Sequence, residues 1–276
     1  MTVIGSNIAA LRASNASTLA SSQLSTSMER LSTGKRINSA KDDAAGLAIA
    51  ATMTAQVRGM NQGIRNANDG ISMAQTAEGA LNEVTNMLQR MRELAVQSAN
   101  GIYSSSDLSN IKAEQDALST EIANVVTNSQ FNGKNLFNGT GGASGTITIQ
   151  AGANAVDAIT MTLPKLTTDT DLAKVVTVSS GASVATASLA DYDSAIAKVA
   201  NTRAGLGATQ NQLTSAVNNL TSNSTNVQDA RSRIEDADFS AETTALAKAQ
   251  ILSQASTAML AQANQSQQSV LKLLGN

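Results

Sequence analysis

The apolar and small residues near the C-terminus recur in alternating steps of four and three, which is the heptad spacing of a coiled coil. They are Ala245, Ala249, Leu252, Ser256, Met259, Ala263, Ser266, Val270 and Leu273. This spacing predicts one long helix with a seam along one side. The seam has few large side chains, and Lys248 is the only charged residue between Thr243 and Leu271. Such a helix is poorly suited to standing alone in water, so it needs helical partners.

The N-terminal segment, Val3–Leu31, has the same texture as the C-terminal seam. Its larger apolar residues lie at helical steps near both ends of the segment: Ile4, Ile8, Leu11, Leu24, Met28 and Leu31. The residues between them are mostly Ala, Ser, Thr and Asn. The sequence therefore predicts a second charge-poor helix at the opposite end of the chain.

A charged stretch separates each terminal helix from the interior of the chain, "STGKRINSAKDDAAG" near the N-terminus and "RSRIEDADFSAE" near the C-terminus. Gly34, in the first stretch, can end the N-terminal helix. Two interpretations of the charged stretches remain open. In the first, both stretches are solvated connectors. In the second, they are two spokes that pack together, and the ion pairs would join Lys35, Arg36, Arg231 and Arg233 to Asp42, Glu235 and Asp236. Exposed ion pairs contribute only about 0–1 kcal/mol, so charge alone does not decide between the two.

The interior predicts three longer amphipathic helices. One stripe of apolar residues runs from Met53 to Ala95 inside a helix expected over 47–100, and a second helix should begin where Ser104 and Asp107 suit an N-cap and first turn. A third stripe runs from Leu189 to Val227. Three such helices can bury one another as an antiparallel bundle.

A different pattern interrupts the helices between residues 129 and 187. "FNGKNLFNG" contains two Asn-Gly turns, and "TITIQAGANAVDAITMTL" alternates with period two on either side of a Gly/Asn turn, which predicts a β-hairpin. Residues 165–187 are rich in Thr, Ser, Val and Gly and are expected to form a loop with short strands. The predicted fold class is therefore mainly α, a long antiparallel helical coiled-coil bundle with a small β-hairpin region.

Composition excludes several function classes. Aromatic residues make up only 2% of the 276 residues, which favours slender helices over a broad globular core. The net charge of −2 argues against nucleic-acid binding, and the absence of both Cys and His removes disulfides, Cys/His zinc sites and a Ser-His-Asp triad. We expect no enzyme activity, no cofactor and no metal. The N-terminus does not resemble a secretory signal peptide, and no stretch is apolar over the roughly 18 residues that a membrane span needs.

Several stretches resemble the bacterial flagellin family, in the order in which that family carries them. They are "LSTGKRINSAKDDAAGLAIA", "LQRMRELAVQSANG", "SQFNG", "ARSRIEDADFSAE" and "QILSQASTAMLAQANQ". Long motifs in the right order are far more specific than one short motif. The resemblance covers roughly the first 165 and the last 90 residues.

The resemblance implies an exported structural subunit that polymerises into the bacterial flagellar filament for motility. Residues 1–46 and 229–276 would then be terminal helices with spoke connectors, and they would pair into an inner-tube coiled coil on assembly. Residues 47–164 and 188–228 would form an outer bundle with the hairpin, and 165–187 a short variable loop in place of large outer domains. The C-terminal seam would pack against Val3–Leu31 of the same chain and against neighbouring copies.

The resemblance also implies partners and a location. The main partner is the chain itself, as a helical homopolymer. An export chaperone, a filament cap and hook-junction proteins would be further partners, whereas nucleic acid and membrane would not. The protein would be extracellular, in the filament, exported by the flagellar type III apparatus without a cleaved signal peptide.

One motif, "QRMRELAVQSAN", resembles the stretch that the flagellin-sensing Toll-like receptor of animals reads. Carried over by matching residues, Gln89, Arg90, Leu94 and Glu114 would form the contact patch. The alternative is a surface between subunits that no receptor meets. Two alternatives to a filament subunit also remain at this point, a hook-filament junction protein and a surface ligand-binding homologue of flagellin.

Overall fold

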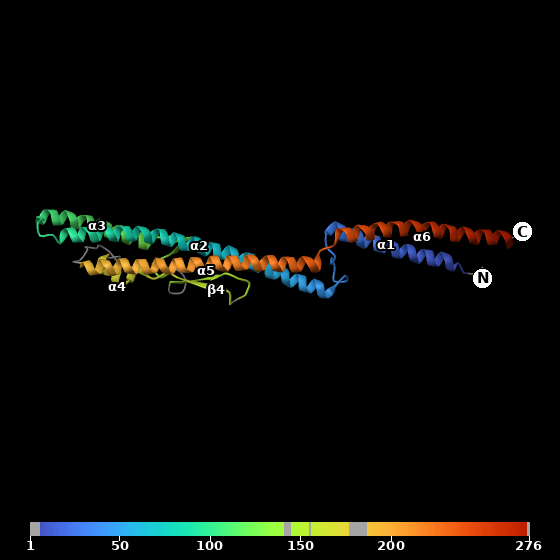
Figure 1. Cartoon of the computed structure of the whole chain (residues 1–276), viewed down its shortest axis with the longest axis horizontal. Coiled ribbons are helices and arrows are strands. Elements are labelled where there is room, and N and C mark those ends of the chain that lie inside the picture. Colours follow the sequence, from blue (N-terminus) through green and yellow to red (C-terminus); the bar gives the residue numbers. More distant parts are fainter. Residues whose placement is uncertain (1–5, 141–144, 155, 177–186, 275–276) are drawn as a thin grey trace. The chain divides into compact units, whose positions relative to one another are not determined.

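The structure is a computed structural model that describes residues 6–140, 145–154, 156–176 and 187–274, with side chains described up to residue 268. It is mainly α-helical with two small hairpins, as the sequence predicts. The helices are α1 (Ile8–Thr33), α2 (Ala44–Ser98), α3 (Ser105–Asn128), α4 (Thr170–Val175), α5 (Leu189–Glu235) and α6 (Phe239–Leu274), with a 3-10 turn η1 at Leu166–Thr168 (Figure 1). The strands are β1 (Gln130–Phe131), β2 (Lys134–Asn135), β3 (Thr146–Gln150) and β4 (Ala158–Thr162).

Local capping chemistry sets several helix ends. Gly34 ends α1 in the left-handed conformation, with φ of 70°, and its N–H donates to the Arg30 carbonyl. Ser104 begins α3 with a capping box, in which its hydroxyl accepts from the backbone N–H of Asp107 and the Asp107 carboxylate accepts from the Ser104 N–H. Both ends lie where the sequence predicts them.

The chain divides into two compact units, which are described separately here. One unit comprises residues 1–55 and 226–276, and the other comprises residues 56–225. Both boundaries fall inside continuous helices, one in α2 and one in α5. The sequence places the corresponding boundaries at 46/47 and 228/229, so the unit that holds the terminal helices also includes the first residues of α2.

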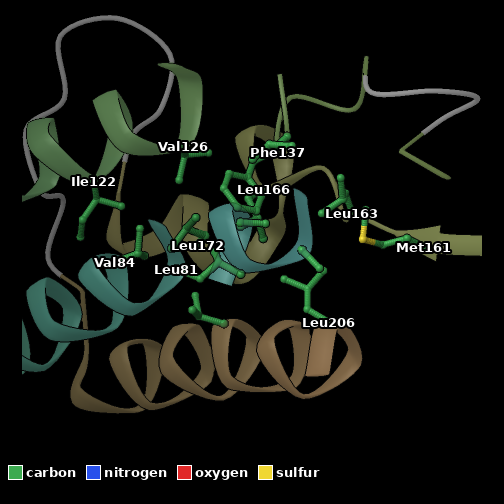
Figure 2. Close-up of a cluster of buried hydrophobic side chains, with 14 of the residues drawn as sticks. Leu81, Val84, Ile122, Val126, Phe137, Met161, Leu163, Leu166, Leu172 and Leu206 are labelled. Atoms are coloured by element: carbon green, nitrogen blue, oxygen red, sulfur yellow. The ribbon is translucent and has the colours of Figure 1, made fainter. Parts of the chain in front are cut away.

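The core of unit 56–225 joins α2, α3 and α5 with the segment that follows the hairpins (Figure 2). Its fully buried residues on α2 recur in steps of three, four and seven: Ala67, Ala74, Ala77, Leu81, Val84, Leu88 and Met91. Helix α3 contributes Ile122 and Val126, and α5 contributes Val199 and Leu206. Polar contacts fix the same helices together, since the Arg92 guanidinium lies 2.7 Å from the Asp193 carboxylate.

The β3–β4 hairpin is antiparallel, with Thr146 opposite Thr162 and Gln150 opposite Ala158, as the alternation predicts. It packs on a face of α2 that carries glycines. A Cβ at Gly63 would lie 2.8 Å from the Ala151 backbone, and one at Gly70 would overlap the Ile149 side chain. Glycine at position 63 therefore lets the hairpin backbone approach the helix closely, whereas a side chain at Gly70 would displace the flexible end of the Ile149 side chain.

The expectation of short strands after residue 165 is wrong for the described part of that segment. Residues 166–175 form η1 and α4 instead, and residues 177–186 lie outside the described residues. The Asp169 carboxylate caps α4 by accepting from the backbone N–H groups of Asp171 and Leu172. Leu172 and Val175 are three residues apart, so one helical turn buries both in the core.

Candidate assembly surface

Helices α1 and α6, from opposite ends of the chain, pack side by side along their length (Figure 1). Their direction is antiparallel, because two contacts fix opposite ends together. The Asn7 side-chain amide donates to the Ala263 carbonyl at 3.3 Å, and the Arg30 guanidinium lies 3.8 Å from the Glu242 carboxylate. The charge-poor helices therefore meet within one chain.

The contact between the two helices, called the inner seam here, follows a heptad on each side. On α1 its buried and half-buried residues are Ala10, Ala13, Ser17, Ala20, Leu24, Ser27 and Leu31. On α6 they are Leu246, Ala249, Ser253, Ser256, Leu260, Ala263 and Gln267. Most of these side chains are small, which lets the two helices approach closely but leaves little apolar area to bury.

The predicted C-terminal seam overlaps the inner seam at three of its seven described positions. Ala249, Ser256 and Ala263 lie in the inner seam, as expected for a contact with the N-terminal helix. The alternate predicted positions face outward instead: Ala245, Leu252, Met259 and Ser266. The sequence prediction did not include Leu246 and Leu260, which lie fourteen residues apart with Ser253 midway between them and so follow a seven-residue repeat, as Leu252 and Met259 do. Val270 and Leu273 lie outside the described side chains.

The predicted apolar residues of the N-terminal helix divide in the same way. Leu24 and Leu31 lie in the inner seam, whereas Ile8, Leu11 and Met28 are exposed. Ile4 lies outside the described residues. The helix period explains the split, because the exposed residues lie outside the Ala/Ser stripe that faces α6.

Both helices carry exposed large apolar side chains beyond the inner seam, called the outer apolar residues here. They are Ile8, Leu11, Leu19 and Met28 on α1, and Phe239, Ile251, Leu252 and Met259 on α6, each 41–70% exposed. Scattered single apolar residues are normal on protein surfaces. A set of eight on two adjacent helices that carry almost no charge is the kind of apolar surface that marks an interaction site.

The two connectors pack together, which decides between the two interpretations of the charged stretches in favour of spokes. Lys35 and Asp236 form an antiparallel bridge, the Arg36 N–H donates to the Glu235 carbonyl at 2.7 Å, and the Ala237 N–H donates to the Gly34 carbonyl at 3.0 Å. The backbone pairing therefore holds the end of α1 against the end of α5.

The charged side chains of the spokes only partly pair as predicted. Lys35 lies 2.5 Å from Glu235, and Arg231 lies 3.9 Å from the same carboxylate. The Arg36 guanidinium lies 3.9 Å from the Asp43 carboxylate, which the prediction did not include, and it donates to the Ile234 carbonyl at 2.7 Å, at the C-terminal end of α5. A cation is favourable there because the last carbonyls of a helix lack internal partners.

Two of the predicted spoke carboxylates are occupied by local hydrogen bonds instead of ion pairs. The Asp42 carboxylate accepts from the backbone N–H groups of Ser39 and Asn38 and from the Ser39 hydroxyl, and these bonds lower the pKa of Asp42. The Asp236 carboxylate accepts from the Ser232 hydroxyl at 2.5 Å. Within the described ranges, no ion pair of Arg233 is found.

The predicted receptor patch is also divided by the structure. Arg90 lies 2.9 Å from Glu114 on α3 and 3.1 Å from Glu93, and hydrogen bonds to these two carboxylates raise the pKa of Arg90. Gln89 is exposed beside it. Leu94 is only 2% exposed, so it cannot be a surface contact, and the prediction is wrong for this residue. A helix flanked by two others buries more than one stripe.

Among the described residues, no group of three or more carboxylates lies close enough to hold a metal ion. None of the described helices is long and apolar enough to cross a membrane.

Comparisons with known proteins agree on one family. Residues 4–141 match the model of the bacterial flagellin N-terminal helical region, and residues 189–274 match that of the C-terminal helical region. The chain is 43% identical to a flagellin of Xenorhabdus nematophila and 42% identical to one of Halalkalibacterium halodurans, with 99% of each chain covered in both cases. A solved structure of a hook-associated protein from Vibrio parahaemolyticus has a TM-score of 0.59 over 71% of this chain and 100% of that chain, at 17% identity, which shows the fold alone.

Proposed function

The chain belongs to the bacterial flagellin family and is a structural subunit of the extracellular flagellar filament, and we propose that it polymerises through the outer apolar residues of α1 and α6. The observation that carries this proposal is the exposure of Leu252 and Met259 on a helix with almost no charge. An exposed apolar set of this kind is stabilised by burial against another copy.

The two overlapping heptads of α6 support a contact with a second helix. Ala249, Ser256 and Ala263 form the inner seam with Leu246 and Leu260 on one side, and they adjoin Leu252 and Met259 on the other. Small residues shared by two stripes allow two helices to approach the same helix closely. One stripe is covered by α1 of the same chain, and a helix of a neighbouring copy would cover the second.

The energy available from this second contact suits a repeating lattice. Fully burying one Leu or Met side chain contributes about 1.5–3 kcal/mol relative to leaving it exposed. A few such residues per subunit offset the entropy of fixing a subunit only when each subunit makes the contact with more than one neighbour. Polymerisation supplies that repetition, whereas a single contact between two subunits does not.

Two substitutions and a matched control test the assembly surface. Leu252→Glu and Met259→Glu place a charge among the outer apolar residues, and Gln254→Glu places the same charge on a polar, exposed position of α6. Seeded polymerisation should fail for the first two variants and proceed for the third, as measured by sedimentation and electron microscopy. Normal filaments from both apolar-site variants would overturn the proposal.

We also propose the partners that membership of the family implies, an export chaperone, a filament cap and hook-junction proteins. The outer apolar residues need cover before polymerisation, and a chaperone that binds α6 would supply it. The purified chaperone of the same flagellar system should bind the wild-type subunit more tightly than Leu252→Glu, as measured by calorimetry. Equal affinity for both would place the chaperone site elsewhere.

Export without a cleaved signal peptide is a further part of the proposal. Helix α1 supplies half of the inner seam, so removal of the N-terminal segment would leave α6 without its partner. N-terminal sequencing of subunits from sheared filaments should therefore find the α1 sequence intact. Filaments whose subunits begin after residue 33 would contradict this.

For the Toll-like receptor, the proposal now rests on Gln89, Arg90 and Glu114, since Leu94 is buried. Arg90→Ala should weaken signalling by monomer because an arginine at the centre of a contact is a frequent energetic anchor. Arg65→Ala, at another exposed position of α2, is the matched control. Equal signalling by both variants and the wild type would remove the receptor from the list of partners.

We propose that the protein is not an enzyme, because a structural subunit of a filament needs no catalytic residues. The adjacent carboxylates Asp42 and Asp43 are engaged as local caps, since Asp43 accepts from the Gly46 N–H at 2.8 Å. The hook-junction and ligand-binding alternatives receive no support, because the likeness to the hook-associated protein extends to the fold alone.

A further inference from the structure

The sulfur atoms of this chain are distributed unevenly between its interior and the outer apolar residues. The chain has nine methionines and no cysteine, so methionine is its only sulfur-containing residue. Met60, Met73, Met91 and Met161 are at most 8% exposed. By contrast, Met28 is 58% exposed and Met259 is 63% exposed.

Both exposed methionines lie among the outer apolar residues. Met28 is on α1 and Met259 is on α6, and neither is part of the inner seam. Of the methionines whose side chains the structure describes, only these two are classed as exposed, because Met53 and Met87 are half-buried. The side chains most open to solvent oxidants therefore stand where the proposed function requires apolar contact with another copy.

We propose that Met28 and Met259 are an oxidation-sensitive modification site, and that peroxide-class oxidants convert them to sulfoxides in the free subunit and thereby block its addition to the filament. The inference about assembly rests on the proposed function. The inference about which methionines are oxidised rests only on their exposure in the free chain.

The chemical step is balanced by the oxidant itself. A lone pair of the thioether sulfur attacks one oxygen of hydrogen peroxide, the O–O bond breaks and an S–O bond forms. The departing oxygen leaves as water after proton transfer, so the sulfur loses two electrons and the peroxide gains them. The product is methionine sulfoxide, a polar group that methionine sulfoxide reductases return to the thioether.

The consequence for assembly follows from the polarity of the sulfoxide. A thioether packs well into an irregular apolar contact, whereas a buried sulfoxide oxygen needs a hydrogen-bond donor. Leu11, Leu19, Ile251 and Leu252 offer no side-chain donor. Each sulfoxide left unpaired in such a contact should raise the critical concentration for polymerisation on the order of tenfold. Polymerisation should in turn shield both sulfurs from oxidant.

The first test maps oxidation by mass spectrometry after limited treatment with hydrogen peroxide. In verified monomer, Met28 and Met259 should be oxidised on the order of tenfold faster than Met60, Met91 or Met161, because a buried sulfur reacts only after local opening. In filaments, the rates at Met28 and Met259 should fall toward those of the buried set. Uniform oxidation of the monomer, or no protection in filaments, would overturn the proposal.

The second test measures seeded polymerisation of the oxidised wild-type subunit before and after repair with methionine sulfoxide reductases. Oxidised subunits should not elongate seeds, and repaired subunits should. The Met28→Leu, Met259→Leu double variant, compared with its own untreated sample, should lose no elongation rate after the same peroxide treatment. Loss of elongation in that treated variant would place the sensitive sulfur elsewhere and overturn the proposal.

The Leu252→Glu variant separates this inference from the proposed function. If Leu252→Glu fails to elongate while the oxidised wild type elongates normally, the assembly surface stands and the oxidation inference is wrong. If Leu252→Glu also elongates normally, the assembly surface is wrong, and the inference that oxidation blocks assembly falls with it.

Discussion

The α2–α3–α5 bundle of unit 56–225 and the α1–α6 pair are both helical, and they differ in how fully the chain itself satisfies them. The bundle buries Leu81, Leu88 and Met91 completely. The fully buried positions of the pair are Ala and Ser, such as Ala20 and Ser256, whereas its Leu and Met residues are half-buried or exposed. The bundle therefore buries its large apolar residues within one chain, whereas the pair leaves many of its own exposed, and we propose that other copies cover them.

This comparison also explains why alanine is so frequent at both ends of the chain. A seam of Ala and Ser buries little area per residue, so it contributes little stability within one subunit. The same small residues let a third helix approach. If this surface is weak in the monomer and repeated in the polymer, as we propose, the order of the terminal helices should depend on assembly.

The substitution with the largest expected effect is Ala263→Glu, which breaks the pair without touching the bundle. Ala263 is 9% exposed in the inner seam, and its carbonyl accepts from the Asn7 side chain. An unpaired carboxylate in such a contact costs several kcal/mol, and the cost recurs in every subunit. We expect exportable monomer with an unchanged main melting transition and no filament elongation at neutral pH.

Ala263→Ser is the control, because the equivalent position of the preceding heptad is already a serine, Ser256. This variant should still elongate seeds. Calorimetry of the monomer and electron microscopy of seeded samples give the two readouts. Filaments of normal length from Ala263→Glu would show that α6 is not buried in an assembly contact.

The next effect belongs to the bundle. Leu81 is fully buried between helices and the segment after the hairpins (Figure 2), so Leu81→Ala should lower the free energy of unfolding by about 2–5 kcal/mol. Ile102→Ala, at a position 79% exposed, should change it by less than about 0.5 kcal/mol. Urea denaturation of the full chain measures both. Similar values for the two variants would mean that the bundle core is not what stabilises the monomer.

A smaller effect is expected at the docking of the hairpin. Gly63→Ala adds a methyl group 2.8 Å from the Ala151 backbone, and the forced shift should cost about 1–3 kcal/mol. Gly205→Ala meets nothing within 4 Å in the middle of α5, so it should stabilise the chain by about 0.5–1 kcal/mol. Thermal unfolding should therefore show changes in stability of opposite sign for the two variants, which would distinguish a packed helix face from an open one. The same sign for both would contradict it.

The smallest effect concerns the acid sensitivity of the bundle. Burial of Asp169 raises its pKa, but the hydrogen bond from Lys198 and those from the Leu172 and Asp171 N–H groups outweigh it, so the pKa is lowered from 3.8. A lowered pKa means that the stabilisation is present above pH 3.8 and is lost as the pH falls through the folded-state pKa.

Asp169→Asn should therefore cost about 1 kcal/mol at neutral pH, and this difference from the wild type should shrink as the pH falls below 3.8. Denaturant titrations at several pH values measure the difference. A penalty that stays constant down to the lowest pH would show that the charge of Asp169 does not contribute.

The sequence by itself predicted the elements that depend on local chemistry. The heptad spacing located the C-terminal helix and apolar residues at helical steps located the N-terminal one. Gly34 and Ser104 marked helix ends, and the two-residue period located β3 and β4. These features depend on interactions among residues close in the chain, so they can be read without knowing what packs against them.

Tertiary structure decided every feature that depends on a partner from elsewhere in the chain. Two heptads share Ala249, Ser256 and Ala263 on α6, and both carry two large residues, so the sequence could not tell which one faces α1. The Asp42 carboxylate accepts hydrogen bonds from backbone N–H groups close to it in the sequence, instead of forming the predicted ion pair.

Leu94 gives the plainest case of the same rule. A motif resemblance assigned it to the surface, yet it is 2% exposed in the bundle. Burial is a property of the space around a side chain, and that space is fixed only when helices distant in sequence pack together. Spacing along the chain determined the helices of this protein, whereas packing decided which of their faces remain for another copy to cover.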